Sequence, residues 1–463
     1  MQSFFAITLL TLKLALRQRL IVVLAVLLLG TVVILPLMIR DDGTAQGFTQ
    51  IILTYTLTLA TAILGLATLW LACGTMARDI EDCQMQMVVV KPVPRWQIWL
   101  GKWAGIMLMN ALLLSMVGVA VYGLMLWRSG SLSEEQREIL RNEVLVARGS
   151  SRMVATDIEP MVEELLTERM KDQQVAEMDR GFVRDQIREQ IRAYQQIVPP
   201  GLARTWRVNL GAARHSLQDQ PIYLRVKFYV PPEESTTLNP NTYLSLWEIG
   251  PPGTPNVHRM PAMKQAAETF HQIEIPPNLF DQEGVLTVNF HNRNPIALLF
   301  RIEDGLEVLY REGGFAMNFM RGLGVICCWL GLLAAVGLAS ASFLSFPVAA
   351  FCCAGILVVA FSGGILSSVV EQGMVFAPDH EGNFGPLGWL NPLMLPVFHF
   401  LFRTVHTALQ FSPIDLMSTG RSITWGMLAS AVGWIILCMG GVFAAFGMIV
   451  FTRRELASTS NQL

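Results

Sequence analysis

The sequence predicts an α-helical polytopic membrane protein of six transmembrane helices, with one large α+β domain inserted between the third helix and the fourth. Two observations predict this class. Of the 463 residues, 52% are hydrophobic and only 15% are charged, which is not the balance of an ordinary soluble domain. The apolar residues also gather into six runs, each near the roughly 20 residues that cross a bilayer. These runs are 20–39, 51–73, 103–127, 319–338, 347–370 and 425–451.

Lysine and arginine flank the apolar runs unevenly, which gives the predicted helices a direction. Short loops rich in these residues stay in the cytoplasm. We therefore expect both termini to be cytoplasmic in a plasma or inner membrane, with residues 128–318 extracytoplasmic. A further stretch, 386–412, is interrupted by Pro392, Pro396 and Arg403 and fits a re-entrant or interfacial helix better than a span. The flanking basic residues are Lys13, Arg17, Arg19, Arg78, Lys91, Arg95, Lys102, Arg453 and Arg454.

The chain therefore divides into four predicted parts, with the insert changing character at a proline pair followed by glycine, 199–201. Before it, apolar residues recur every three to five positions, which predicts amphipathic helices. After it, apolar and polar residues alternate, and short strands separated by turns predict a β-sandwich that resembles jelly-roll modules binding sugars or partner proteins. The parts are membrane residues 1–127, a helical subdomain 128–200, a β-sandwich-like subdomain 201–318 and membrane residues 319–463. The predicted strands are 222–230, 243–249, 270–275, 285–291 and 297–303.

No motif for chemistry stands out in this chain. It has no phosphate-binding G-x-x-x-x-G-K-[ST] loop, no G-x-S-x-G turn and no H-E-x-x-H metal-binding helix. Its seven cysteines follow no metal-ligand spacing, and a net charge of −2 gives no hint of a nucleic-acid partner. We therefore expect no enzyme activity, no catalytic residues, no cofactor and no metal in this chain.

The connection between the second and third apolar runs, residues 77–102, is the most informative segment. Charged residues leave the second run, a short apolar stretch 85–90 follows, and then a proline, an arginine and the pair Gly101 and Lys102 open the third run. This order resembles the connection in ABC-2 type permeases, the membrane subunits of ABC transporters. Two further segments, 338–349 and 451–456, are similar to that family's turn between the fourth and fifth spans and to its closing sequence.

The resemblance implies that residues 77–102 form a coupling loop that docks on a separate ATP-binding subunit. It also implies that this subunit binds the ATP and Mg, and that the permease pairs with a second copy or with a related chain. The insert departs from the family's pattern, so its role does not carry over. The implied interface residues are Arg78, Asp79, Glu81, Met85, Val88, Lys91, Pro92, Arg95 and Trp96.

The residues of this loop also support a partner without the resemblance. Its apolar stretch needs a cover, which a docked subunit would supply. The alternative is a helix in the lipid headgroups, with Trp96 and Trp99 as interfacial anchors. Small residues in the last run allow close helix packing, either within one subunit or between two copies. These packing candidates are Gly440, Gly441, Ala444 and Ala445.

The sequence thus predicts the permease subunit of an ATP-driven exporter, with membrane lipid, an ATPase and a second permease as partners. The alternative is a membrane-anchored adaptor whose extracytoplasmic sandwich binds a ligand or a protein. An ATPase that is encoded beside this gene or co-purifies with the chain would favour the permease. The sequence does not indicate the substrate.

Overall fold

The computed structural model groups the chain into two compact units. The helical unit is Met1–Ala147 with Gly314–Leu463, and the second unit is Arg148–Gly313. The ends of the predicted insert, 128–147 and 314–318, therefore belong to the helical unit. The structure describes residues 2–17, 19–39, 44, 47, 49–82, 93–130, 132–140, 145–153, 158–172, 180–215, 217, 220, 222–230, 242–302, 304–361, 390, 392, 394–399, 402–403 and 411–454.

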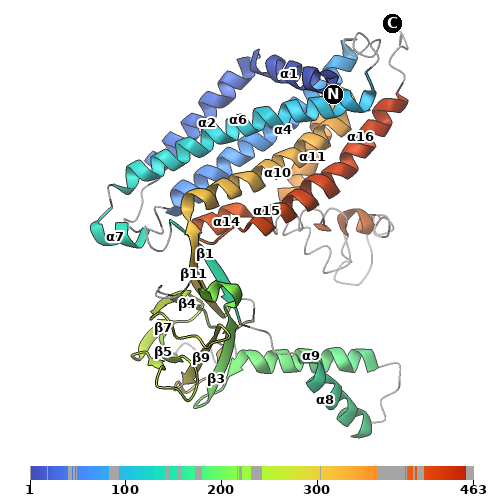
Figure 1. Ribbon diagram of the computed structural model, residues 1–463. Helices are drawn as coiled ribbons and strands as arrows, with labels where there is room; N and C mark the ends of the chain where they lie inside the picture. The colour runs from blue at the N-terminus through green and yellow to red at the C-terminus, as the bar shows by residue number, and fades with distance from the viewer. Residues whose placement is uncertain are drawn as a thin grey trace, which may run out of the picture. The chain divides into compact units, whose positions relative to one another are not determined.

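Long apolar helices dominate the helical unit (Figure 1). Among the described residues, five helices are long and apolar enough to cross a membrane, namely Ile21–Met38, Ile51–Glu81, Arg95–Ser129, Phe315–Ala341 and Trp425–Arg453. The elements are α1 (Gln2–Arg17), α2 (Arg19–Met38), the π-helical segment η1 (Gln50–Thr56), α4 (Leu57–Glu81), α6 (Arg95–Ser129), α7 (Glu134–Ile139), α10 (Phe315–Ala341), α11 (Phe346–Phe361), α14 (Pro413–Ser418), α15 (Trp425–Ala431), the π-helical segment η6 (Val432–Gly440) and α16 (Gly441–Arg453).

The prediction of apolar helices with a β-rich region is confirmed, while the sixth span stays a prediction. Within the fifth apolar run, the structure shows a shorter apolar helix, Phe346–Val358. Residues 362–370 of that run lie outside the described residues. The same holds for most of 386–412, the stretch predicted to be re-entrant or interfacial.

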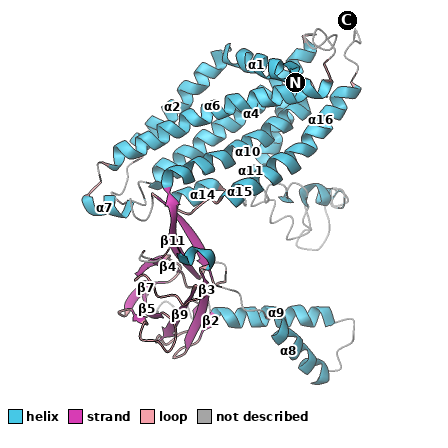
Figure 2. Cartoon of the chain, in the orientation of Figure 1, coloured by secondary structure: helices cyan, strands magenta, loops and turns pink. Residues whose placement is uncertain are grey.

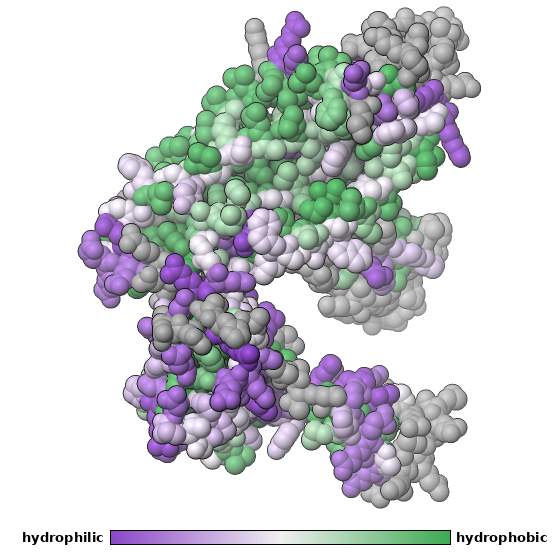
Figure 3. All heavy atoms as spheres, in the orientation of Figure 1, coloured by the Kyte–Doolittle hydropathy of each residue, from purple (hydrophilic) through white to green (hydrophobic). Residues whose placement is uncertain are grey.

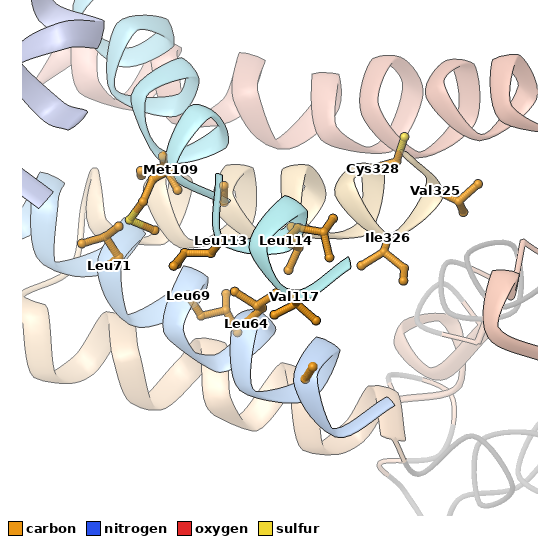
Figure 4. Packing of buried hydrophobic residues seen from close by; sticks show 14 of the residues in the cluster. Leu64, Leu69, Leu71, Met109, Leu113, Leu114, Val117, Val325, Ile326 and Cys328 are labelled. Carbon is orange, nitrogen blue, oxygen red and sulfur yellow. The ribbon is translucent and has the colours of Figure 1, made fainter. Parts of the chain in front are cut away.

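Buried aliphatic side chains from α4, α6 and α10 pack together in the helical unit (Figure 4). Glycine allows the helices to approach closely, since a Cβ at Gly337 would lie 2.7 Å from the Cβ of Ala72. Large apolar side chains also cover the outside of the helical unit (Figure 3). Phe351 on α11, for example, is 80% exposed. Such an exterior suits a lipid solvent.

Strands form the larger part of the second unit (Figure 2). One sheet has the order β1-β11-β4-β8 and another β3-β9-β5-β6, with β7 also on β5 and β10 paired with β2. Strand β4 is antiparallel to β8 and β11, and β9 is antiparallel to β3 and β5. The strands are β1 (Val146–Arg152), β2 (Ile197–Val198), β3 (Ala203–Asn209), β4 (Ile222–Val226), β5 (Thr242–Ile249), β6 (His258–Arg259), β7 (Met263–Ala266), β8 (His271–Ile275), β9 (Val285–Asn292), β10 (Leu298–Leu299) and β11 (Leu306–Gly314).

The inner residues of the two larger sheets share one hydrophobic core, here called the two-sheet core. Phe300 lies at its centre, with its ring centroid 5.0 Å from those of both Trp206 and Phe290. Strand β1 is unexpected, because the sequence predicts helices throughout 128–200. The segment contains Gly149 and two serines, so it has no strand pattern of its own, and its place comes from pairing with the distant β11.

Two helices in the second unit, α8 (Glu159–Asp172) and α9 (Arg180–Gln196), match the amphipathic pattern of the sequence. Among their described side chains, the apolar ones that the two helices bury fully are Val162, Leu166, Ile187 and Ile191. Ion pairs supplement this small contact. Glu159 pairs with Arg184 at 2.8 Å and with Arg188 at 2.9 Å, and the hydrogen bonds from these arginines hold the pKa of Glu159 below its ordinary value.

Candidate functional site

The predicted coupling loop is largely helical at its two ends. Helix α4 continues to Glu81, and α6 begins at Arg95 after Pro94 at its N-cap position. Gly101 and Lys102 therefore lie inside α6 rather than at its start. Of the predicted interface residues, Arg78, Asp79, Glu81, Arg95 and Trp96 lie on these helices. Met85, Val88, Lys91 and Pro92 lie outside the described residues.

Lys102 is a cation on the buried face of α6, and two partners on α4 hold its ammonium there. Its side chain is only 7% exposed and forms an ion pair with the Asp79 carboxylate. The ammonium also donates to the backbone carbonyl of Thr75, with 2.6 Å between Nζ and the oxygen. A buried ammonium needs such partners because taking an ion out of water costs on the order of several kcal/mol. The pair ties the N-terminal part of α6, about two turns in from its start, to the end of α4.

Two other residues on the last turn of α4 hold the start of α11. The Arg78 guanidinium lies 4.5 Å from the centroid of the Phe346 ring. The Glu81 carboxylate accepts a hydrogen bond from the backbone N–H of Phe346 at 2.9 Å. Because the first N–H groups of a helix have no partner inside it, Glu81 acts as a cap supplied by another helix.

Arg95 performs the matching task at the C-terminus of α16. Its Nη1 donates to the backbone carbonyls of Phe451 at 2.9 Å, Thr452 at 2.7 Å and Arg454 at 3.0 Å. Arg454 in turn donates to the carbonyl of Ser342 at 3.0 Å, just beyond α10. The last carbonyls of a helix carry partial negative charge and favour a cation. The first residue of α6 thereby fixes the end of the last span.

These contacts define the charged end of the helical unit: Arg78, Asp79, Glu81, Arg95 and Lys102. The structure brings together all the predicted interface residues that it describes, but it engages the charged ones inside the chain. Trp96 differs, since it lies on the first turn of α6 and is 51% exposed. An indole with that exposure is available to a partner or to lipid headgroups.

The predicted packing residues of the last span line an apolar groove. Gly440, Gly441 and Ala444 face side chains of α6 and α10 there. Ala445 is not part of its lining. The sequence does not decide whether these small residues pack within one chain or between two. The groove shows that the described part of the chain leaves some of this face unfilled.

A row of alternating cations and aromatic rings marks the second unit. Arg225 lies 3.9 Å from the Phe270 ring centroid, Lys227 lies 4.9 Å from Phe270 and 4.7 Å from Tyr229, and Arg301 lies 3.9 Å from Tyr229. The hydrogen bond to Tyr229 and then that to Asp304 raise the pKa of Lys227, while burial lowers it in part. Cation–π contacts of this kind steady side chains that still expose polar atoms.

Several partners in the charged end escape sequence reasoning. These partners take part mainly through backbone groups or a ring, so their residue types give no signal in the sequence. They are Phe346, Ser342 and Phe451. The Asp79–Lys102 pair does leave a signal in the sequence, because a charged residue beside an apolar run needs a partner of opposite charge. Helix α1 is also missed, although it packs on Gly101 and Gly105, where added Cβ atoms would meet Ile7 and Thr11.

Compared with protein-family models, curated proteins and solved structures, the chain shows no match. The similarity to ABC-2 permeases therefore stays a prediction from the sequence. Among the described residues, no group of three or more His, Cys, Asp or Glu side chains is placed to hold a metal ion.

Proposed function

We propose that this chain is the permease subunit of an ATP-driven ABC-2 type exporter, embedded by six spans with both termini in the cytoplasm. A separate ATPase, which binds the ATP and Mg, docks on the α4–α6 connection, and the permease works as a pair with a second copy or a related chain. One observation carries the proposal. Both ends of that connection are fastened to other helices, α4 to the start of α11 and α6 to the end of α16.

This arrangement gives a docked ATPase a mechanical route into the helices. A displacement of the connection would move Glu81 and Arg95 together with the helix ends that they cap. The two ends are joined to each other by Asp79 and Lys102, so they would move as one piece. ATP binding would then favour one of two packings of the spans over the other.

The test uses Trp96→Ala, because it removes an exposed side chain without releasing a helix end. Arg78, Glu81 and Arg95 are unsuitable, since each one holds another helix. The matched control is Trp127→Ala on the opposite end of the same helix, where the side chain is 73% exposed. We expect the ATPase encoded nearest this gene to co-purify with the control and to be lost from Trp96→Ala. Equal recovery with both variants would count against the docking site.

The adaptor alternative keeps one observation in its favour, the row of Arg225, Phe270, Lys227, Tyr229 and Arg301. Rings and cations side by side suit a polar partner outside the membrane. In that case the cellular phenotype would depend on Arg301, whose side chain is exposed, and would survive deletion of the ATPase. Arg301→Glu combined with an ATPase deletion separates the two functions.

A further inference from the structure

The groove beside the last span is an apolar cavity of about 220 Å³ that the described residues do not fill. Its walls come from three elements of the helical unit: α6, α10 and the junction of η6 with α16. Five of the lining residues are glycine or alanine, which accounts for the hollow. They are Gly331, Ala335, Gly440, Gly441 and Ala444.

The walls are held in place rather than soft. The indole Nε1 of Trp103 donates to the carbonyl of Gly331 at 3.0 Å, which joins α6 to α10 across one side. The opposite side includes Ile436, Leu437 and Gly440 from the π-helical segment η6. Short π-helical segments recur at functional sites because they offset a helix from regular packing. Leu437 is 69% exposed, so this side also borders the outside of the unit.

The size of the groove decides what can enter it. Pockets for whole drug-sized ligands begin at about 300 Å³, whereas an apolar cavity of about 150 Å³ already holds benzene. A second helix does not fit, since a helix with its side chains is about 10 Å across. A hydrocarbon chain of several methylene groups matches both the volume and the apolar walls.

The position of the groove indicates where such a chain would come from. Trp99 and Trp103 lie four and eight residues beyond Arg95, about 6 and 12 Å along the helix axis. The groove thus begins just below the charged end, at the depth where lipid tails follow their headgroups. Arg453, exposed on the last turn of α16, lies nine residues beyond Ala444, about 14 Å along the helix axis, and supplies a cation at the headgroup end, where a lipid phosphate is its complement.

We propose that this groove is a binding site for one acyl chain of a membrane phospholipid, taken from the leaflet next to the charged end. The inference rests on the proposed function only in that the helices must span a membrane. The lipid fills the space between the last span and α6, the two elements that Arg95 joins at their ends.

The experiment fills the groove with a side chain that costs nothing elsewhere. A Cβ at Gly441 would have no atom within 4 Å, and the same is true of Gly433, which lies on η6 but does not line the groove. Gly441→Leu is therefore the test variant and Gly433→Leu its control. The full-length chain in nanodiscs receives phosphatidylethanolamine with a diazirine in one acyl chain, and the cross-linked peptides are mapped.

We expect label on the peptides that contain Trp103 and Leu437. Gly441→Leu should lower that label about tenfold, equivalent to about 1.4 kcal/mol, while Gly433→Leu leaves it unchanged. Equal labelling in all three proteins would overturn the site, because it would show only the general lipid surround. A dimer lost specifically in Gly441→Leu, with the label unaffected, would also overturn it in favour of a second copy. If alkaline buffer extracted the chain from membranes, the chain would not be integral to the membrane. That result would overturn the proposed function itself.

Discussion

The helical unit and the second unit differ in what holds them together. The two-sheet core buries aromatic rings, with Phe300 in contact with both Trp206 and Phe290. The helices of the other unit expose large apolar side chains and rely on close glycine contacts and on charges at their ends. Burial of apolar area drives the first arrangement in water, whereas helices in lipid gain little from it. A large apolar residue should therefore contribute much to stability where it is buried in the second unit, and little where it covers the outside of the helical unit.

The largest expected effect comes from replacing one phenylalanine by alanine in each unit. Phe300→Ala removes a ring that is 1% exposed, and we expect the second unit to lose about 3–5 kcal/mol of stability. Phe351→Ala removes one that is 80% exposed on α11, where a change within about 0.5 kcal/mol is expected. Hydrogen exchange of β9 and of α11 in nanodiscs measures both. Similar losses in the two units would break the comparison.

A smaller effect is expected from the ion pair at the charged end. Asp79→Ala leaves the ammonium of Lys102 buried without its carboxylate and should cost about 1–3 kcal/mol. Adding Lys102→Met removes the stranded charge and should recover most of that loss. The thermal unfolding midpoints of the two single variants and the double variant complete the cycle. Additive losses would mean that the two side chains do not depend on each other.

The smallest effect concerns Glu159, which joins α8 to α9. Its pKa is lowered by hydrogen bonds from Arg184 and then Arg188, so its contribution is present above the ordinary carboxylate pKa. That contribution to stability should disappear as the pH falls below the ordinary carboxylate range and through the lowered pKa of Glu159. Protection of the α8 amides measured against pH follows it, with Glu159→Gln as the control that should show no such step. An unchanged profile in the parent chain would contradict the pairing.

Hydropathy makes the long helices predictable, because lipid exposure and burial both favour apolar residues along runs such as 319–338. The helix ends are harder to predict. Helix α6 starts at Arg95, eight residues before its apolar run, because Lys102 and Arg95 find partners on α4 and α16. In the second unit, β4 shows clear alternation, but β1 has none and depends on β11.

The candidate site was predictable to a similar degree. Arg78, Glu81 and Arg95 stand out in the sequence as charges around a loop, which suggests contacts with a partner. Their actual contacts are backbone groups and a ring far along the chain, and no pattern of residue types encodes those. Trp96 is the exposed member of the set. It becomes the candidate for contact with a partner because its charged neighbours already contact other parts of the chain.

The central proposal is the topology, in which the connection 77–102 faces the cytoplasm and its ATP while residues 128–318 are extracytoplasmic. The direct measurement is labelling with an impermeant maleimide of Trp96→Cys and of Tyr194→Cys, whose parent side chains are 51% and 72% exposed. The parent chain, with Cys352 and Cys438 exposed on its helices, gives the background. In intact cells whose outer layers let the maleimide through, position 194 should react. Position 96 should react only after the membrane is opened. Labelling of position 96 in sealed cells would contradict the account.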